Sequence, residues 1–166
     1  MLETARLSLL PWTETDLANF RQLATDPEVL RYINGGVPWT DEQMLEFIGR
    51  QMRHFRDRGY CMWKLQQRSG GLFLGFCGIQ PAVVEDVAEV EIGWWLKPEY
   101  WRQGLITEAA HAVLRDALDR IGLQRLIAII RPANARSIAV AERLGLRYER
   151  DAIYRSIPVS IYATPA

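Results

Sequence analysis

Cysteine is scarce in this sequence, and the two cysteines present form no recognisable motif. Cys61 and Cys77 lie in separate apolar stretches, with no CxxC spacing and no histidine close by. Structural zinc sites need clustered Cys or His ligands, and disulfide scaffolds need several paired cysteines. We therefore expect no metal site and no disulfide framework, and a reducing cytoplasm is the expected location.

Long hydrophobic runs are also missing, and neither sign of charge dominates. No apolar stretch reaches the roughly 18 residues of a bilayer-spanning helix, and the first residues carry acids where a signal peptide would be basic. The 20 basic residues balance the 20 acidic ones, which leaves no cationic tail for nucleic acid. The six tryptophans are scattered rather than arrayed for stacking on bases. We expect neither a membrane nor a nucleic-acid partner.

What the chain does have is the composition of one folded domain. Its 166 residues are 49% hydrophobic and 24% charged, which is usual for a globular protein. A chain of this length buries roughly 70% of the surface that it exposes when unfolded, enough to fold without a metal or a disulfide. No repeat, linker or low-complexity segment divides it, so residues 1–166 are predicted to form a single domain.

The first third of the chain is typical of one strand followed by helices. Residues 6–10 alternate in hydrophobicity and stop at Pro11, which predicts a strand. A helix is predicted from Thr13, a short one over 26–32, and a third that ends near Gly59. The third helix begins with a capping box of Thr40 and Gln43, and its expected apolar stripe comprises Met44, Leu45, Phe47, Ile48, Met52 and Phe55.

Beyond Gly59 the period of the pattern changes from helical to extended. Residues 60–67, 72–80 and 87–96 are predicted to be three consecutive strands of an antiparallel meander. The remaining elements are predicted to be a helix over 107–121, a strand over 125–130, a helix capped by Asn134, and strands over 148–154 and 159–163. This order indicates one mixed α/β layer structure.

Charge is distributed unevenly along the second half. Residues 84–92 hold Glu85, Asp86, Glu89 and Glu91 without a base, whereas residues 120–155 hold eight arginines against three acids. An acidic patch and a basic patch therefore follow one another. The acidic stretch favours a cationic ligand.

The junction between the strand over 87–96 and the helix after it is the most informative segment. A loop with Pro98 and Gly104 turns between them, and a helix N-terminus presents unpaired N–H groups and a positive dipole end to one spot. Gly104 lets an anion approach without a side chain in the way, and Arg102 adds a positive charge. Such junctions are common, so this pattern alone favours an ordinary structural turn.

Two linked motifs favour a binding site at this junction over an ordinary structural turn. The segment WRQGLIT resembles the acetyl-coenzyme A motif Q/R-x-x-G-x-G/A of the GNAT acetyltransferase superfamily. The segment RPANARSIAVAERLGLRYE, about 30 residues further on, resembles the second GNAT motif. The opening TARLSLLPWTETDLANFRQLATDPEVLRYI resembles the branch that acetylates the N-termini of ribosomal proteins and related amines. The resemblance covers nearly the whole chain.

The resemblance implies a fold and a coenzyme site. The fold is a mixed, α+β-like α/β domain with a central, mostly antiparallel sheet of about seven strands, splayed between the fourth and fifth (87–96 and 125–130). Trp95 and Leu96 then offer backbone groups to the pantetheine arm, Asn134 reaches the pantetheine or acetyl end, and Ser137 lies near the sulfur. The pyrophosphate is expected among the N–H groups of Arg102, Gln103, Gly104, Leu105, Ile106 and Thr107. Arg136 and Arg143 are open alternatives for the nucleotide phosphate.

The sequence departs from the family pattern at two positions that matter for the chemistry. Ile106 replaces the second Gly or Ala of the motif, which leaves the pyrophosphate approach open only if this side chain points inward. The family's usual tyrosine acid, seven residues after the asparagine, is Ala141 here. Ser137 or Tyr154 are the candidates to assist the departing thiolate, although a thiol with a reference pKa of about 8.5 hardly demands an acid.

The attacking amine needs a group that accepts its proton. Glu89 and Glu91 are two residues apart on one predicted strand, so they share a face beside the expected splay. Glu91 is the preferred base or amine anchor and Glu89 the weaker one, while a pair on the solvent face of the sheet is the structural alternative. Neither cysteine lies in a motif, so no covalent nucleophile is nominated.

The expected function is therefore transfer of acetyl from acetyl-CoA to a primary amine by direct attack in a ternary complex. The acceptor is a protein N-terminal α-amine or a small amine such as a polyamine, an amino acid or an antibiotic. A non-catalytic coenzyme A binding protein is the second hypothesis. A general nucleotide-binding module is the third, although the chain lacks both the GxxxxGK[ST] and the GxGxxG fingerprints. Dimers are common in the superfamily, so a homodimer stays open.

Overall fold

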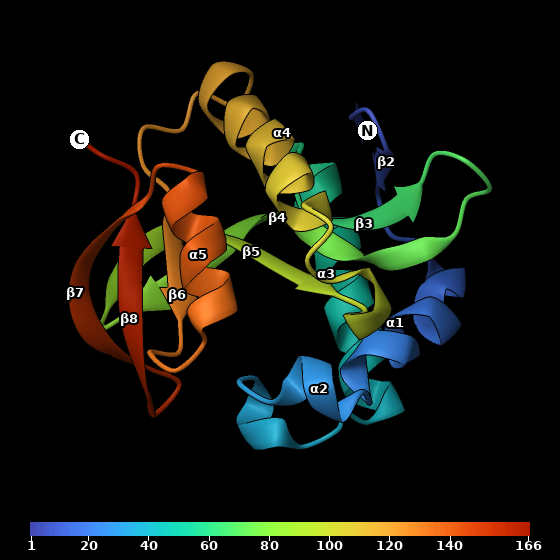
Figure 1. Cartoon of the computed structure of the whole chain (residues 1–166), viewed down its shortest axis with the longest axis horizontal. Helices are drawn as coiled ribbons and strands as arrows, with labels where there is room; N and C mark the ends of the chain where they lie inside the picture. The colour runs from blue at the N-terminus through green and yellow to red at the C-terminus, as the bar shows by residue number, and fades with distance from the viewer.

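The structure is a computed structural model that describes residues 1–166, with eight strands and five α-helices (Figure 1). The strands are β1 (Leu2–Glu3), β2 (Leu7–Leu10), β3 (Met62–Gln67), β4 (Phe73–Val84), β5 (Val87–Leu96), β6 (Ile127–Ile130), β7 (Arg147–Tyr154) and β8 (Ile157–Ala163). The α-helices are α1 (Leu17–Ala24), α2 (Pro27–Leu30), α3 (Asp41–Arg58), α4 (Leu105–Asp119) and α5 (Ala135–Arg143). Single 3-10 turns lie at Glu14–Asp16, Asn34–Gly36 and Pro98–Tyr100.

All eight strands form one sheet in the order β1-β2-β3-β4-β5-β6-β8-β7. Every neighbouring pair is antiparallel except β5 and β6, which run parallel. The predicted mixed α/β architecture and its mostly antiparallel sheet are confirmed. The predicted number of about seven strands is exceeded by β1, whose two residues pair with Leu9 and Ser8 of β2 and are too few to show an alternation.

The predicted meander is present as β3, β4 and β5, but β4 extends beyond its predicted end at Gln80. Its ladder with β3 stops at the pair Met62 and Gly78, whereas its ladder with β5 continues to the pair Val84 and Val87. Pro81 lies in this extension, where β4 has no neighbour on the β3 side that would need its missing N–H. A proline is therefore tolerated where the sequence pattern indicates a strand end.

Helices cover both faces of the sheet (Figure 1). The amphipathic helix α4 packs with α5 over one face, in a core cluster of 24 buried residues that includes Leu9, Trp63 and Ala110. The helices α1 and α3 pack on the other face, in a cluster of 11 buried residues that includes Phe20 and Phe47. Burial of these two apolar layers at roughly 25 cal/mol per Å² of apolar surface drives folding.

Helix ends follow the predicted capping residues closely. The Thr40–Gln43 capping box forms, with both reciprocal hydrogen bonds present, at 3.2 and 2.9 Å, and left-handed Gly59 ends α3. The helix predicted over 107–121 instead begins at Leu105 and ends at Asp119, because left-handed Gly104 is its N-cap and Leu105 is already buried. Leu45 was predicted in the apolar stripe of α3 but is 49% exposed, since it lies one residue outside the stripe set by Met44, Phe47 and Ile48.

None of the helices combines the length and hydropathy needed to cross a bilayer.

Candidate functional site

The parallel strands β5 and β6 are joined at a single point. The only residues in register between them are Glu91 and Ile127, after which β5 runs on through Ile92 to Leu96 without a ladder partner on that side. The predicted splay between these two strands is therefore present. Backbone groups along the free side of β5 remain available to a ligand that imitates a strand.

A cavity of about 630 Å³ opens at this splay. Its walls come from the end of β5, the loop and first turn of α4, the exposed side of α5, and Val29 and Tyr32 at α2. The predicted coenzyme-site residues that line it are Trp95, Leu96, Arg102, Gly104, Leu105, Ile106, Thr107, Asn134 and Ser137. Gln103 is not among the lining residues, and its side chain donates to the Glu99 carbonyl at 3.2 Å. Arg136 and Arg143 lie on the same wall.

The loop before α4 presents a row of unpaired donors to this cavity. Arg102 and Gly104 both have positive φ, at 62° and 73°, which turns the chain sharply into the helix. From Arg102 to Thr107 no backbone N–H donates to a protein acceptor, and the first internal bond of the helix runs from Glu108 to Gly104. Successive free N–H groups at a helix N-terminus bind anions, so this loop suits a phosphate or pyrophosphate.

Ile106 points into the protein rather than across the cavity. It is 8% exposed and packs in the larger core cluster with Ala109 and Val113, so only its edge contributes to the cavity wall. The branched side chain that replaces the motif's second small residue therefore leaves the loop accessible.

Arg6 holds the loop from behind, a contact that the sequence did not predict. Its guanidinium donates to the Gln103 carbonyl at 2.9 Å and to Glu108 Oε2 at 2.6 Å, while the Arg6 backbone N–H and the Thr4 hydroxyl donate to Glu108 Oε1. Partial burial raises the pKa of Glu108, but these hydrogen bonds outweigh it and hold that pKa below its ordinary value. The segment between β1 and β2 thus holds a loop that lies 97 residues further along the chain.

Trp101 and Arg136 form a second unpredicted contact on the cavity wall. Trp101 occupies the first position of the WRQGLI motif, where the family has Gln or Arg. Its indole N–H donates to the Leu96 carbonyl at 2.8 Å, and the guanidinium of Arg136 lies 3.6 Å from its ring centroid. The stacking holds a positive charge beside the loop.

A second cavity of about 360 Å³ lies across the splay from the first. The two cavities share six lining residues, which are Tyr32, Ile33, Trp94, Trp95, Asn134 and Ser137. All three predicted catalytic residues, Glu91, Ser137 and Tyr154, line this second cavity. Two ligands bound in the two cavities would therefore meet at the tryptophan pair and the start of α5.

Glu91 sits at the end of a hydrogen-bonded chain of amides. The Met62 backbone N–H donates to Gln51 Oε1 at 2.9 Å, Gln51 Nε2 donates to Gln80 Oε1 at 2.9 Å, and Gln80 Nε2 donates to Glu91 Oε2 at 3.1 Å. Because a backbone N–H can only donate, the chain fixes the orientation of both side-chain amides. Burial raises the pKa of Glu91, and the Gln80 hydrogen bond and the charge of Arg155 partly offset that rise.

Tyr154 and Ser137 line the same cavity and come from β7 and α5. Burial, and next the charge of Glu91, raise the pKa of Tyr154, so its hydroxyl stays protonated at neutral pH. The Ser137 N–H donates to Asn134 Oδ1 at 3.3 Å in the N-cap of α5, which leaves the Asn134 Nδ2 group free. Ala141, where a tyrosine is usual, is fully buried in the core and faces neither cavity.

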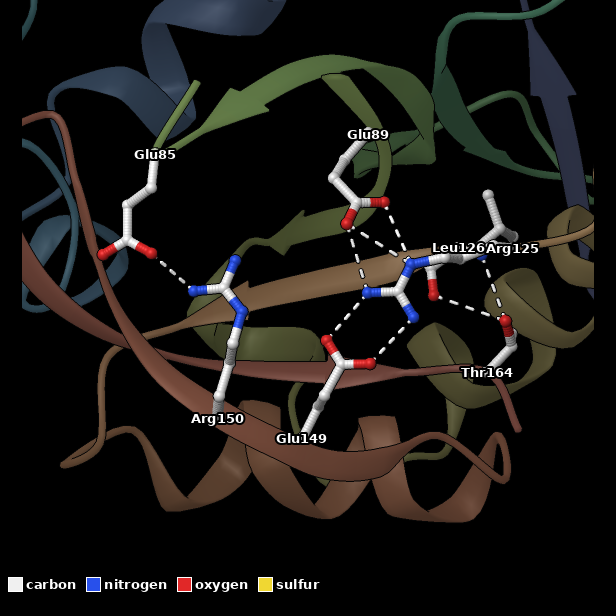
Figure 2. A network of polar contacts seen from close by, with 7 residues as sticks. All are labelled: Glu85, Glu89, Arg125, Leu126, Glu149, Arg150 and Thr164. Carbon is white, nitrogen blue, oxygen red and sulfur yellow. Dashed lines mark hydrogen bonds and ion pairs between the residues drawn. The ribbon is translucent and has the colours of Figure 1, made fainter. Parts of the chain in front are cut away.

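Glu89 lines neither cavity and instead forms an ion pair with Arg125. Arg125 binds Glu89 and Glu149 together, at 3.1 and 2.7 Å, and Arg150 binds Glu85 at 2.6 Å (Figure 2). Two arginines of the basic patch therefore pair with two acids of the acidic patch, Arg125 with Glu89 and Arg150 with Glu85. Asp86 and Glu91 make no ion pair, so two of the four acids of this stretch keep an unpaired charge.

The cysteines offer no nucleophile. Both are buried, and burial raises the pKa of Cys61 to about 12 and that of Cys77 further still. A thiol that stays protonated at neutral pH attacks poorly. No three or more His, Cys, Asp or Glu side chains gather in a group that could hold a metal ion.

Comparison with known proteins relates this geometry to one family. The family model of the Acetyltransferase (GNAT) domain matches residues 6–147. The uncharacterised protein YkkB of Bacillus subtilis is 31% identical over 162 residues, which cover 97% of this chain and 93% of that protein. An acetyltransferase from Agrobacterium tumefaciens superposes with a TM-score of 0.85 at 24% identity, covering 99% of this chain and 94% of that one. The ribosomal L7/L12 α-N-protein acetyltransferase RimL, solved with coenzyme A, has a TM-score of 0.78 at 20% identity, covering 96% and 94%.

Proposed function

The chain belongs to the GNAT family and is an N-acetyltransferase that uses acetyl-CoA, and from this premise we propose that acetyl passes directly to a primary amine while both substrates are bound. The observation that carries the proposal is the meeting of two cavities at Trp94, Trp95, Asn134 and Ser137. Acetyl-CoA belongs in the larger cavity and the acceptor amine in the smaller one.

The larger cavity suits the coenzyme. Six successive free N–H groups from Arg102 to Thr107 match a pyrophosphate, and the free side of β5 up to Trp95 and Leu96 matches the amides of the pantetheine arm. A volume of about 630 Å³ is within the usual range for a site of this kind. The Asn134 Nδ2 group and the Ser137 hydroxyl lie where the acetyl end would reach the second cavity.

The smaller cavity supplies what an amine needs in order to react. An amine has a reference pKa of about 7.7 to 8.0 at a protein N-terminus and about 10.4 on a lysine, so it must lose a proton before it attacks. Glu91 is a half-buried carboxylate that accepts this proton, directly or through water. The protonated hydroxyl of Tyr154, with Ser137 as the alternative, donates toward the departing sulfur. Positioning of the two substrates supplies most of the acceleration.

A direct route fits the chemistry of the chain better than an acyl-enzyme. Both thiols are buried and stay protonated, and neither lines a cavity. The amine therefore attacks the thioester carbon itself, the carbon–sulfur bond breaks, and the products are the N-acetylated amine and coenzyme A. Glu91 takes the amine proton in the same sequence.

Two acceptor classes remain from the sequence, a protein N-terminal α-amine and a small amine. The fold shared with RimL is consistent with the first class. The modest volume of the second cavity supports a small amine.

Calorimetry on a matched glycine pair tests the proposal. Gly104→Glu should abolish acetyl-CoA binding, because it places a carboxylate among the phosphate donors and forces a side chain into a left-handed position. Gly122→Glu is the control, since Gly122 has a similar φ of 79° in open space away from both cavities. Equal affinity of the two variants would refute the assigned coenzyme site. Coenzyme binding without thiol release for any amine would support a non-catalytic binding protein instead.

A further inference from the structure

The smaller cavity carries an excess of positive charge. Its lining includes three arginines from three parts of the chain, Arg50 of α3, Arg131 after β6 and Arg155 in the β7–β8 turn. Glu91 is the only acid on its wall. A site built for a polyamine would have the opposite balance, because like charges raise the cost of binding.

These arginines lack the carboxylate partners that others in the chain have. Arg125 and Arg150 bind Glu89, Glu149 and Glu85 at 2.6 to 3.1 Å (Figure 2). None of the ion pairs in the structure includes Arg131 or Arg155. Arg50 has one loose contact, with Glu46 at 4.0 Å. The cavity therefore holds guanidinium groups whose charge the protein does not neutralise.

Arg50 and Arg155 line the same cavity, and their like charges repel. Burial and the charge of Arg155 lower the pKa of Arg50. Arg155 also lies over the ring of Tyr154, at 5.1 Å from its centroid, and its charge reaches Glu91. An anion bound between the two guanidiniums would relieve their repulsion, and guanidinium forks suit carboxylate and phosphate oxygens.

The backbone holds Arg155 at a position that ordinarily disfavours arginine. Tyr154 and Ile157 pair across a two-residue turn, and both central residues, Arg155 and Ser156, have positive φ, at 50° and 64°. Gly, Asn and Asp are the residues that suit such a turn, so the chain carries strain here. The turn keeps Arg155 on the cavity wall.

We propose that the acceptor is a small primary amine that also carries a carboxylate or phosphate group, with Arg155 and Arg50 binding the anion and Glu91 facing the amine. The inference rests on the proposed acetyltransferase function and assigns its acceptor class. A volume of about 360 Å³ suits a molecule of amino-acid size. A linear polyamine lacks the anion and leaves both guanidiniums unpaired.

The test compares acceptors with and without the anion. Initial rates of coenzyme A release are measured for amino acids, for the corresponding amino-acid amides, for phosphoethanolamine, and for diamines. We expect kcat/KM to be at least tenfold higher for the amino acid than for its amide, because the amide loses the charge that the arginines bind, although its less basic amine deprotonates more readily. Phosphoethanolamine distinguishes a phosphate-bearing acceptor from a carboxylate-bearing one.

Variants assign the preference to the two arginines. Arg50→Gln should reduce kcat/KM for the anionic acceptor about tenfold or more and leave the amide and the acetyl-CoA affinity nearly unchanged, which removes the preference. Arg155→Gln should do the same when it is measured above the acid limb of the pH profile, because the charge of Arg155 also lowers the pKa of Glu91. Arg58→Gln is the control, because it removes the same charge from the same helix as Arg50 but outside both cavities.

Three results would overturn the inference. They are equal rates for acids and amides, faster acetylation of diamines, or acetylation confined to longer peptides. Failure of the proposed function itself looks different, because no acceptor of any class would then release coenzyme A from the unaltered protein.

Discussion

Gln80 Nε2 donates to Glu91 Oε2 at 3.1 Å, from the residue directly opposite in the β4–β5 ladder. The donor stabilises the ionised carboxylate, against burial that favours the protonated form and raises the Glu91 pKa. The cross-strand register thus places a hydrogen-bond donor on the residue that faces the acceptor cavity. Two predictions follow from the balance between these effects.

Glu91→Gln should lower kcat/KM by about 10²- to 10⁴-fold, the usual contribution of a general base. It should also stabilise the protein at neutral pH. Because the Glu91 pKa is raised by folding, the ionised carboxylate disfavours the native state above that raised pKa, and the effect vanishes below the ordinary Glu pKa of about 4.3. Urea denaturation at pH 7 and in acid measures the difference in the free energy of unfolding between the variant and the parent. A variant less stable than the parent at pH 7 would contradict the predicted stabilisation.

Gln80→Met should move the acid limb of the kcat/KM profile to higher pH. The Gln80 hydrogen bond lowers the pKa of Glu91, whereas burial raises it. Without this donor the effect of burial is offset less, so the Glu91 pKa rises further. Acetyl-CoA affinity, measured by calorimetry, should stay the same because Gln80 does not line the larger cavity. A uniform loss of activity at every pH, without movement of the limb, would mean that Gln80 serves only packing.

Tyr154→Phe and Ser137→Ala separate the two candidates for assisting the departing thiolate. If Tyr154 donates, Tyr154→Phe should lower kcat roughly 10- to 100-fold at neutral pH, while Ser137→Ala has a smaller effect. The loss is modest because a thiolate with a reference pKa of about 8.5 leaves readily. Single-turnover rates at saturating substrate concentrations compare the two variants. A larger loss of rate in Ser137→Ala than in Tyr154→Phe would assign the role to Ser137.

Arg6→Met should weaken acetyl-CoA binding about tenfold, since the guanidinium fixes the Gln103 carbonyl and Glu108 behind the phosphate loop. The KM for the acceptor should hardly change. Arg68→Met is the matched control, because Arg68 also binds the N-terminal segment, at the Thr4 carbonyl, but does not contact the loop. Titration calorimetry compares the two, and equal losses would point to general destabilisation.

Arg125→Leu should destabilise the protein by about 2 kcal/mol at pH 7, since it leaves the nearly buried Glu89 without a partner. The cost is below that of a fully buried pair because the Arg125 side chain is 40% exposed. The pKa of Glu149 is lowered by Arg125, so this part of the contribution is present above the ordinary Glu pKa and is lost as the pH falls through the lowered one. Arg21→Leu, which breaks the exposed pair with Asp41, should cost about 0.5 kcal/mol or less in the same urea titration.

Elements with local signals could be predicted well. The capping box of Thr40 and Gln43, left-handed Gly59 and the Asn134 cap depend on residues within one turn, so the helix positions follow from the sequence. The extension of β4 past Pro81 could not be predicted, because it depends on β4 having no neighbour on one side. The two-residue β1 exists only through its pairing with β2.

The candidate site likewise has parts that follow from local sequence and parts that depend on contacts between distant segments. The motif around Gly104 and the helix capped by Asn134 are local, and both lie on the larger cavity. Glu89 and Glu91 are equivalent by alternation, and only the distant partner Arg125 distinguishes them. Arg50 and Arg155 come from segments 105 residues apart in the sequence, so their presence on one wall is a property of the tertiary fold.

The single register pair of Glu91 and Ile127 has a mechanical consequence. Across this line, the portion from β1 to β5 and the portion from β6 to β8 share only one rung of main chain. Side chains make the other contacts, which are the packing of α4 and α5, a small buried cluster with Val84 and Ile127, and the ion pairs of Arg125 and Arg150. A cosubstrate that contacts both portions of the sheet stabilises their arrangement relative to one another. Its arrival should slow amide exchange on both sides at once and raise the melting temperature of the whole.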